Sequence, residues 1–221
     1  GDGTFAAPAA AAATPVTLTV LTFETSTRYL GGIGGSGTNT FNSHGLVLNT
    51  GATAISFAST TPRIVSNPSG GGIYGVSPTF SVRMALFQTG AAGSSTSYFG
   101  LGIPTVDGTG HTYTVIHIGF KIVSVAGTLN LYATQADGTT ETASASLTTL
   151  GFGDILDLIG KINTTVSTDY YWQKNSTALS SATNLTTNMP STGGQQAQFS
   201  VSNNSVATAT DYYVNSFSYQ K

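Results

Sequence analysis

The chain has 221 residues, of which 7 % are charged, whereas roughly 25 % are charged in an average globular protein. Seven Lys and Arg against nine Asp and Glu give a formal net charge of -2. This excludes a strongly basic surface for nucleic acid or for an anionic membrane. There is no cysteine, and no apolar run approaches the roughly 18 residues that span a bilayer. The length suits one large all-β domain.

The first fifteen residues form a low-complexity lead with an alanine tract bracketed by Pro8 and Pro15. A helix of this length is marginal on its own, so we expect an extended arm or linker over residues 1–15. Small side chains let neighbouring chains approach closely, and Phe5, Pro8 and Pro15 are the candidate contacts between copies. Residues 16–221 are expected to form the folded head domain.

Apolar and polar residues alternate through much of the remaining chain, which is typical of β-strands. The clearest example is residues 79–88, where Phe80, Val82, Met84 and Leu86 share one face. Further strands are predicted at residues 16–24, 45–49, 54–58, 64–65, 97–103, 111–125, 127–135, 139–146, 169–173, 178–189, 198–206 and 211–219.

Three segments carry more specific expectations. The Gly-rich run at residues 31–37 is expected to be a flexible loop. Gly119 is expected to mark a bulge within the long strand at residues 111–125. Residues 151–163 are the only helix-compatible apolar stretch, with one or two turns at most because of their glycines.

The end of the chain is predicted to form an antiparallel pair from residues 198–206 and 211–219. In the last of these, alternation places Tyr213, Phe217 and Tyr219 on one mainly aromatic face. Roughly eleven to fourteen strands, with turn signals every eight to twelve residues, predict an all-β antiparallel sandwich or barrel.

Several pieces then appear in a characteristic order. They are Gly1-Asp-Gly-Thr-Phe-Ala-Ala-Pro, Phe80-Ser-Val-Arg-Met-Ala-Leu, Tyr98-Phe-Gly-Leu-Gly, His117-Ile-Gly-Phe-Lys, Tyr170-Tyr-Trp, Asn188-Met-Pro and Asp211-Tyr-Tyr-Val-Asn-Ser-Phe-Ser-Tyr. This order resembles the concanavalin A-like jelly-roll heads of bacteriophage fibre proteins, over about residues 80–221 and the first eight. The chain departs from that pattern where Lys174-Asn-Ser-Thr replaces an Asn-Gly turn.

The resemblance implies a homotrimeric, non-enzymatic virion protein, either a fibre knob or a capsid decoration. Its partners would be other virion proteins and a host-surface glycan or protein, and it would need no cofactor. Two alternatives remain open: a carbohydrate-binding module of a secreted protein, and a glycoside hydrolase.

Hydrolysis of a glycoside needs two carboxyl groups about 5 to 10 Å apart. The Glu-x-Asp-x-x-Glu pattern of laminarinase-like relatives is absent, and the only two Glu residues are Glu24 and Glu141. Asp154 and Asp157 are the closest acidic pair, and we interpret them as caps or solvated loop carboxylates. We therefore expect no enzyme.

Metal binding and nucleophilic catalysis are also unsupported. His44, His111 and His117 are scattered, and on a continuous strand the last two would lie about 20 Å apart. There is no Gly-x-Ser-x-Gly elbow. We predict neither a metal site nor a catalytic triad.

Glycan binding remains as the open possibility, because sugars dock on exposed aromatic rings. Candidates by residue type are Tyr74, Tyr98, Tyr113, Tyr170, Tyr171 and Trp172. Most aromatic residues of a sandwich lie in its core. We select Tyr74, Tyr98 and Tyr113 as candidate glycan or receptor contacts, with Tyr74 favoured because its loop is Gly-rich.

Overall fold

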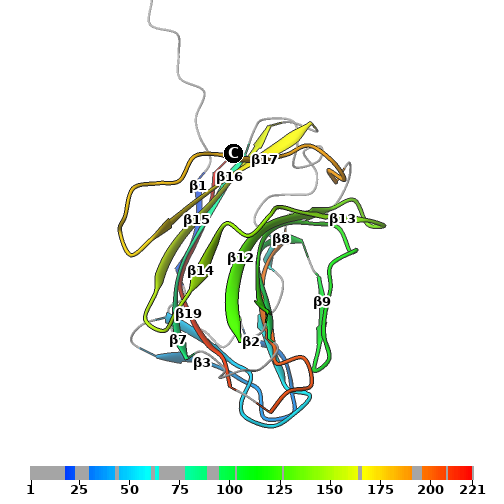
Figure 1. The fold of residues 1–221 in the computed structure, drawn as a ribbon, viewed down its shortest axis with the longest axis vertical. Helices are drawn as coiled ribbons and strands as arrows, with labels where there is room; N and C mark the ends of the chain where they lie inside the picture. The colour runs from blue at the N-terminus through cyan, green and yellow to red at the C-terminus, as the bar shows by residue number, and fades with distance from the viewer. Residues whose placement is uncertain are drawn as a thin grey trace, which may run out of the picture.

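The computed structural model describes residues 18–22, 30–42, 45–60, 63–64, 78–88, 95–102, 104–125, 127–163, 166–190, 196–207 and 209–220. These ranges contain β-strands, turns and bends, and no helix. They therefore also contain no helix that is long and apolar enough to cross a membrane. Two large antiparallel sheets stack face to face, as expected for an all-β sandwich (Figure 1).

The first sheet, here sheet A, has eight strands. Its strands are, in spatial order, β17 (Thr183–Leu185), β16 (Ser167–Lys174), β15 (Ile155–Asn163), β7 (Thr79–Gln88), β19 (Asp211–Gln220), β4 (Gly45–Asn49) and β3 (Thr38–Asn42), with β1 (Leu18–Thr22) also paired to β19. The last strand in the sequence therefore lies inside the sheet.

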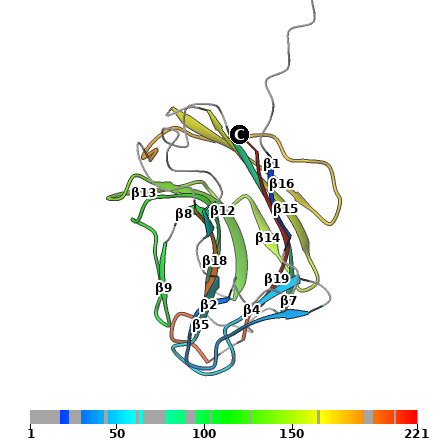
Figure 2. The same ribbon diagram turned by 180° about the vertical axis from the view of Figure 1, so that it is seen from behind.

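The second sheet, here sheet B, has nine strands. Its strands are, in spatial order, β13 (Glu141–Ala143), β12 (Thr128–Ala136), β11 (His117–Val125), β8 (Thr96–Gly102), β18 (Gln196–Ser202), β5 (Phe57–Thr60) and β2 (Leu30–Gly34), with β14 (Thr148–Leu150) paired to β12 and β6 (Arg63–Ile64) to β18. A separate two-stranded hairpin, β9 (Thr105–Asp107) and β10 (Gly110–Thr112), lies beside the outer face of sheet B (Figures 1 and 2).

The core lies between the two sheets and is rich in aromatic rings. Phe99 of sheet B meets Tyr212 of sheet A edge to face, with ring centroids 5.2 Å apart. Phe120 of sheet B meets Tyr170 of sheet A in the same way at 5.3 Å. Such pairs add to the free energy gained by burying the rings and fix how the two sheets sit on each other.

The expected helix at residues 151–163 is wrong. Residues Ile155–Asn163 form strand β15, which pairs with both β7 and β16. Burial alternates along it, with Leu156, Leu158 and Ile162 in the core. Isoleucines and leucines lie on both faces of this strand. Their spacing in the sequence therefore also matches one face of a helix.

The long strand expected at residues 111–125 is interrupted. Its first part belongs to β10, a turn follows, and β11 begins at His117. Gly119 is not a bulge, because β11 keeps continuous register with β8 and β12 through it. The Gly-rich run expected as a loop contributes most of β2, which pairs with β5.

The final strands also differ from expectation. β18 lies in sheet B and β19 in sheet A, so they do not pair with each other. A register shift between Val214 and Ser216 makes Asn215 an extra residue in β19. This bulge turns the strand over, so that Tyr212, Val214, Phe217 and Tyr219 all point into the core.

The departure at the Lys174–Thr177 turn has a simple geometry. Asn175 and Ser176 have φ of 52° and 58°, and the Thr177 amide donates to the Lys174 carbonyl at 3.0 Å. Two successive positive φ angles define a type I′ turn, the same type that Asn-Gly favours. The returning chain forms a strand only at β17, which is shorter than the expected strand at residues 178–189. Before β17, the Ser180 amide also donates to the Trp172 carbonyl of β16 at 2.9 Å.

Candidate functional site

The outer face of sheet B carries a connected group of polar and aromatic contacts beside the β9–β10 hairpin. The β9–β10 hairpin is tied to this face by His111. One ring nitrogen of His111 lies 2.8 Å from the Thr96 hydroxyl of β8, and the other lies 2.9 Å from the Ser200 hydroxyl of β18. This anchors the segment that continues towards β11.

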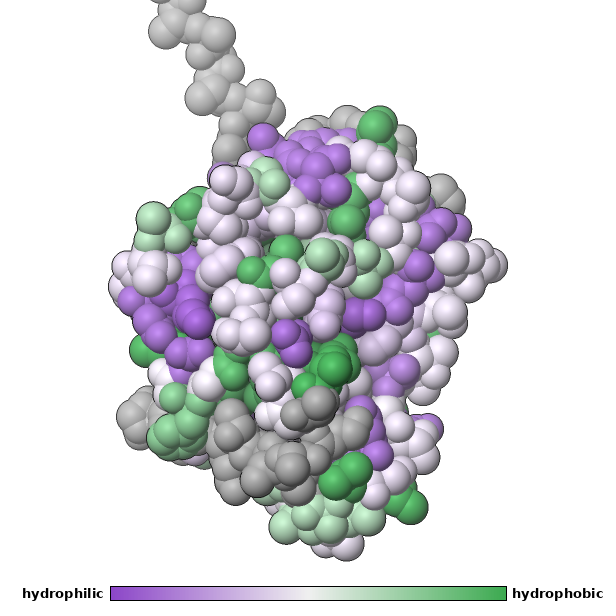
Figure 3. Space-filling view, in the orientation of Figure 1, coloured by the Kyte–Doolittle hydropathy of each residue, from purple (hydrophilic) through white to green (hydrophobic). Residues whose placement is uncertain are grey.

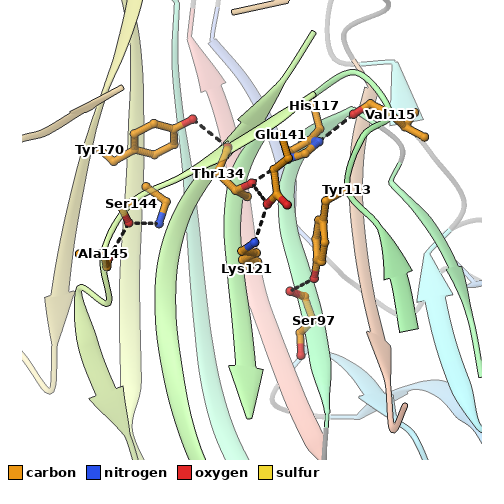
Figure 4. Close-up of polar contacts among 11 residues, drawn as sticks. Ser97, Tyr113, Val115, His117, Lys121, Thr134, Glu141, Ser144, Ala145 and Tyr170 are labelled. Atoms are coloured by element: carbon orange, nitrogen blue, oxygen red, sulfur yellow. Dashed lines mark hydrogen bonds and ion pairs between the residues drawn. The ribbon is translucent and has the colours of Figure 1, made fainter. Parts of the chain in front are cut away.

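Tyr113 follows the hairpin and lies between two histidines. Its ring stacks on His111 with centroids 5.3 Å apart and lies 5.9 Å from the His117 ring. Its hydroxyl donates to the Ser97 carbonyl at 3.2 Å (Figure 4). The two histidines, expected about 20 Å apart on one strand, are thus brought close because the chain turns between them.

Next to Tyr113, Lys121 of β11 forms an ion pair with Glu141 of β13, with Nζ 2.5 Å from Oε1. The ammonium lies 4.8 Å from the Tyr113 ring centroid and 5.9 Å from that of Tyr132. Tyr132 is directly opposite Lys121 in the β11–β12 register. The pair is partly exposed, at 14 % for the Lys121 side chain and 22 % for Glu141.

Two buried groups support Glu141, Thr134 directly and His117 through Thr134. The Thr134 hydroxyl lies 2.6 Å from Glu141 Oε1 and 2.9 Å from His117 Nε2. His117 Nδ1 lies 2.8 Å from the Val115 carbonyl oxygen. Figure 4 shows these groups converging on one carboxylate. We call the set the Lys121 cluster; its members are Tyr113, His117, Lys121, Tyr132, Thr134 and Glu141.

Burial controls the ionisation of the cluster. It lowers the pKa of His117 from 6.5 to about 4 and that of His111 to about 3, so both rings are neutral near pH 7. Burial, and then the nearby Glu141 carboxylate, raise the pKa of Tyr113 well above its ordinary value. Lys121 and Glu141 are therefore the charged pair of an otherwise neutral cluster.

The predicted glycan contacts have separate outcomes. Tyr98 is fully buried, with its hydroxyl donating to the Leu101 carbonyl and lying 3.2 Å from the Ile118 carbonyl oxygen, so it is no exposed platform. The reason is that the Tyr113 and His117 rings cover it from the outer side of the sheet. Tyr113 belongs to the cluster but is half-buried. Tyr74 lies outside the described residues.

The arm contacts Phe5, Pro8 and Pro15 also lie outside the described residues. Of the other aromatic candidates, Tyr170 is a core residue. Trp172 packs on the core, while Tyr171 is half-buried in β16.

Asp154 and Asp157 each contact other groups of the chain. The Asp154 carboxylate accepts from the Gly151 amide at 2.8 Å, and its Oδ2 lies 3.8 Å from Lys174 Nζ. Asp157 lies 3.7 Å from Arg83 on sheet A. Each carboxylate thus has its own cation, which agrees with the interpretation as caps or solvated loop carboxylates. The described residues contain no group of three or more His, Cys, Asp or Glu that could hold a metal ion.

The sequence did not single out Lys121, Tyr132 or Glu141. Lys121 and Glu141 are twenty residues apart in the sequence. Their ion pair forms because β11 pairs with β12 and β12 pairs with β13. One signal was available: the predicted strands at 111–125 and 127–135 form a hairpin, and its register places Tyr132 beside Lys121.

No protein-family model matches the chain, and no curated protein matches its sequence. Solved structures do match the fold. Peanut lectin in complex with a nine-residue peptide has a TM-score of 0.57 and 10 % identity, covering 94 % of this chain and 97 % of the lectin chain. Lectin UEA-II complexed with galactose has a TM-score of 0.54 and 11 % identity, covering 92 % and 97 %.

An enzyme shares this architecture as well. The alginate lyase from Klebsiella pneumoniae has a TM-score of 0.50 and 7 % identity, covering 83 % of this chain and 82 % of the lyase. These likenesses establish a concanavalin A-like, legume-lectin-type β-sandwich, as the order of the sequence pieces implied.

Proposed function

We propose that the domain is a non-enzymatic glycan-binding module that binds sugar at the Lys121 cluster. The observation that carries this proposal is the Lys121–Glu141 ion pair set beside the rings of Tyr113 and Tyr132. The lectin-like fold supports it at a coarse level.

The chemistry of the cluster suits a sugar. Within the described chain, Glu141 Oε2 makes no hydrogen bond, so it is an acceptor for a ligand hydroxyl. Lys121 supplies further N–H donors, and the half-buried Tyr132 ring supplies an apolar surface for the C–H face of a pyranose. Because the ion pair is neutral overall, it can satisfy hydroxyls without attracting ions.

The Lys121 cluster lacks the groups that glycoside hydrolysis needs. The cluster holds one carboxylate, Glu141, whereas glycoside hydrolysis needs two. The Tyr113 hydroxyl is committed to the Ser97 carbonyl, and its raised pKa disfavours the phenolate that a base would need. We therefore propose binding without turnover.

The test is binding to an array of immobilised oligosaccharides with neutral, amino and acidic sugars. The wild-type protein should bind at least one class, and Tyr132→Ala should reduce that binding by roughly tenfold or more. Tyr171→Ala is the matched control, because Tyr171 is also a half-buried strand tyrosine but lies in sheet A. Equal losses from both variants, or no binding by the wild type, would contradict the proposal.

We also propose the biological setting. The order of sequence pieces at residues 80–221 supports a bacteriophage fibre head or capsid decoration on the virion surface. In this setting residues 16–221 form the head and residues 1–15 the arm of a homotrimer. Its partners would be other virion proteins and a host-surface glycan or protein. The alternative is a carbohydrate-binding module of a secreted protein, which would be a stable monomer.

A further inference from the structure

The Thr134 hydroxyl has one proton and two neighbours that can take it. The Glu141 carboxylate lies 2.6 Å away on β13, and His117 Nε2 lies 2.9 Å away on β11 (Figure 4). Thr134 itself is fully buried, so no bulk water competes for the proton. The direction of this hydroxyl is therefore decided by its two neighbours.

His117 cannot choose freely between its tautomers. The Val115 carbonyl oxygen can only accept, so the nitrogen facing it, Nδ1, must carry a hydrogen. In the neutral ring Nε2 is then an acceptor, and Thr134 must donate to it. In the imidazolium ring Nε2 carries a hydrogen as well, and Thr134 accepts it and donates to Glu141.

We propose that Thr134 passes the protonation state of His117 to Glu141, which makes His117 a positioning residue for the carboxylate of the Lys121 cluster. In the structure the Thr134 hydroxyl donates to Glu141 Oε1 at 2.6 Å. When His117 is neutral, this proton turns to Nε2, Oε1 accepts from Lys121 alone, and the carboxylate is a stronger acceptor for a ligand at Oε2. When His117 is protonated, Thr134 donates to Oε1 and the acceptor strength at Oε2 falls. The ligand part of this inference rests on the proposed glycan-binding function.

The groups around His117 support such coupling. Glu141 favours the imidazolium and Lys121 opposes it. The Tyr98 ring lies 5.3 Å from His117 on the β8 side, and Tyr113 lies 5.9 Å away on the covering segment, with His111 stacked beyond it. Glu141, the carboxylate that favours protonation of His117, is thus also the group that His117 reaches through Thr134.

The tautomer can be read directly by ¹⁵N NMR of the imidazole nitrogens. At pH 7 the wild-type protein should show His117 with Nδ1 protonated and Nε2 unprotonated. The opposite tautomer would overturn the proposal, because Thr134 could then donate only to Glu141 whatever the pH.

A titration of the same signals tests the relay itself. Thr134→Val and Glu141→Gln should each lower the pKa of His117 by about half a pH unit or more, since the imidazolium loses a charge-assisted chain. Thr134→Ser should restore the wild-type value. Thr142→Val is the control, because that hydroxyl contacts Thr187 and Asn188 instead. An unchanged His117 pKa in both relay variants would overturn the proposal.

The ligand consequence is measured by retention of the array oligosaccharides on immobilised protein between pH 7 and pH 3, a range that includes the His117 pKa of about 4. Wild-type retention should fall as His117 protonates, and the fall should be weaker in Thr134→Val. If no oligosaccharide is retained but the NMR shifts occur, only the binding function fails. If binding depends on Tyr132 but Thr134→Val leaves its pH dependence unchanged, the control of Glu141 by His117 fails alone.

Discussion

Gly119 shows how a single missing side chain shapes the outer face of sheet B. It pairs with Gly100 across β11 and β8. A Cβ at Gly119 would lie 2.6 Å from the Phe99 carbonyl oxygen and 2.8 Å from the Tyr98 hydroxyl oxygen. The two glycines therefore leave the space in which the Tyr98 ring lies, and the Lys121 cluster is built next to that ring.

We accordingly expect Gly119→Ala to destabilise the domain by about 1 to 3 kcal/mol, because neither backbone nor ring can yield easily. The measurement is the urea midpoint of unfolding. Gly151→Ala is the control, since a Cβ there would meet only the Asp154 carboxylate at 4.0 Å. Equal midpoints for the two variants would show that the close approach has no energetic consequence.

His117 makes the domain acid-sensitive. Its pKa is about 4 in the folded protein, against an ordinary value of 6.5 for an exposed histidine, so between these values the unfolded chain binds more protons than the folded one. Stability is then full above pH 6.5 and is lost as the pH falls towards 4. At about 1.4 kcal/mol per pH unit, this window is worth about 3 kcal/mol.

The check is the free energy of unfolding at several pH values between 7 and 4, for the wild type and for His117→Gln. The variant should be less stable at pH 7 and lose less stability on acidification. An equally steep loss in both proteins would assign the acid sensitivity to other groups, of which His111 is the first to consider because burial also lowers its pKa.

At the scale of the element, the type I′ turn between β16 and β17 is a clear case. Asn tolerates a left-handed backbone, but Ser176 at φ 58° does so at a cost. Ser176→Gly should therefore stabilise the domain by about 0.5 to 1 kcal/mol, less than the full strain because glycine also gains freedom when unfolded. Thermal unfolding measures this, and Ser176→Ala should give no gain. A lower melting temperature for the glycine variant would contradict this account of the turn.

Strand identity was predictable where alternation was clean, as in β7. It was not predictable at β15. There the core residues Leu156 and Leu158 are interleaved with Ile155 and Ile159, and the apolar residues also fit the period of a helix. The bulge at Asn215 also leaves no local signal, because it is set by pairing with β7. Local sequence therefore defined strands better than it defined their partners.

The candidate site was harder to predict for the same reason. Tyr113 was among the residues selected. Tyr98 was selected as well, but the segment that follows the β9–β10 hairpin covers it, and the alternation of residues within β8 gives no sign of that cover. The Lys121–Glu141 pair depends on three strands lying in register. Residue types could suggest sugar binding, while the position of the site required the fold.

At the scale of the molecule, the surface carries few charges. In the view of Figure 3 most of the described surface has intermediate hydropathy, with hydrophobic residues scattered over it. Such a surface provides little electrostatic repulsion between copies. A permanent homotrimer would bury part of it, in keeping with the proposed fibre head.

Light scattering on the protein with and without residues 1–15 tests this assembly. We expect a trimer for the full chain and weaker association without the arm, because the small residues of the arm would pack around the symmetry axis. A monomer in both forms would contradict the fibre head and favour the secreted carbohydrate-binding module.

The position of β19 inside sheet A has a consequence for synthesis of the protein. β19 is the last strand in chain order, yet it pairs with β7, β4 and β1, which are made much earlier. While the chain is still emerging from the ribosome, β7 and β4 have exposed edges facing a gap that only β19 can fill. Sheet A should therefore close after translation has passed Gln220, and a nascent chain that stalls before Asp211 should be prone to aggregate through these edges.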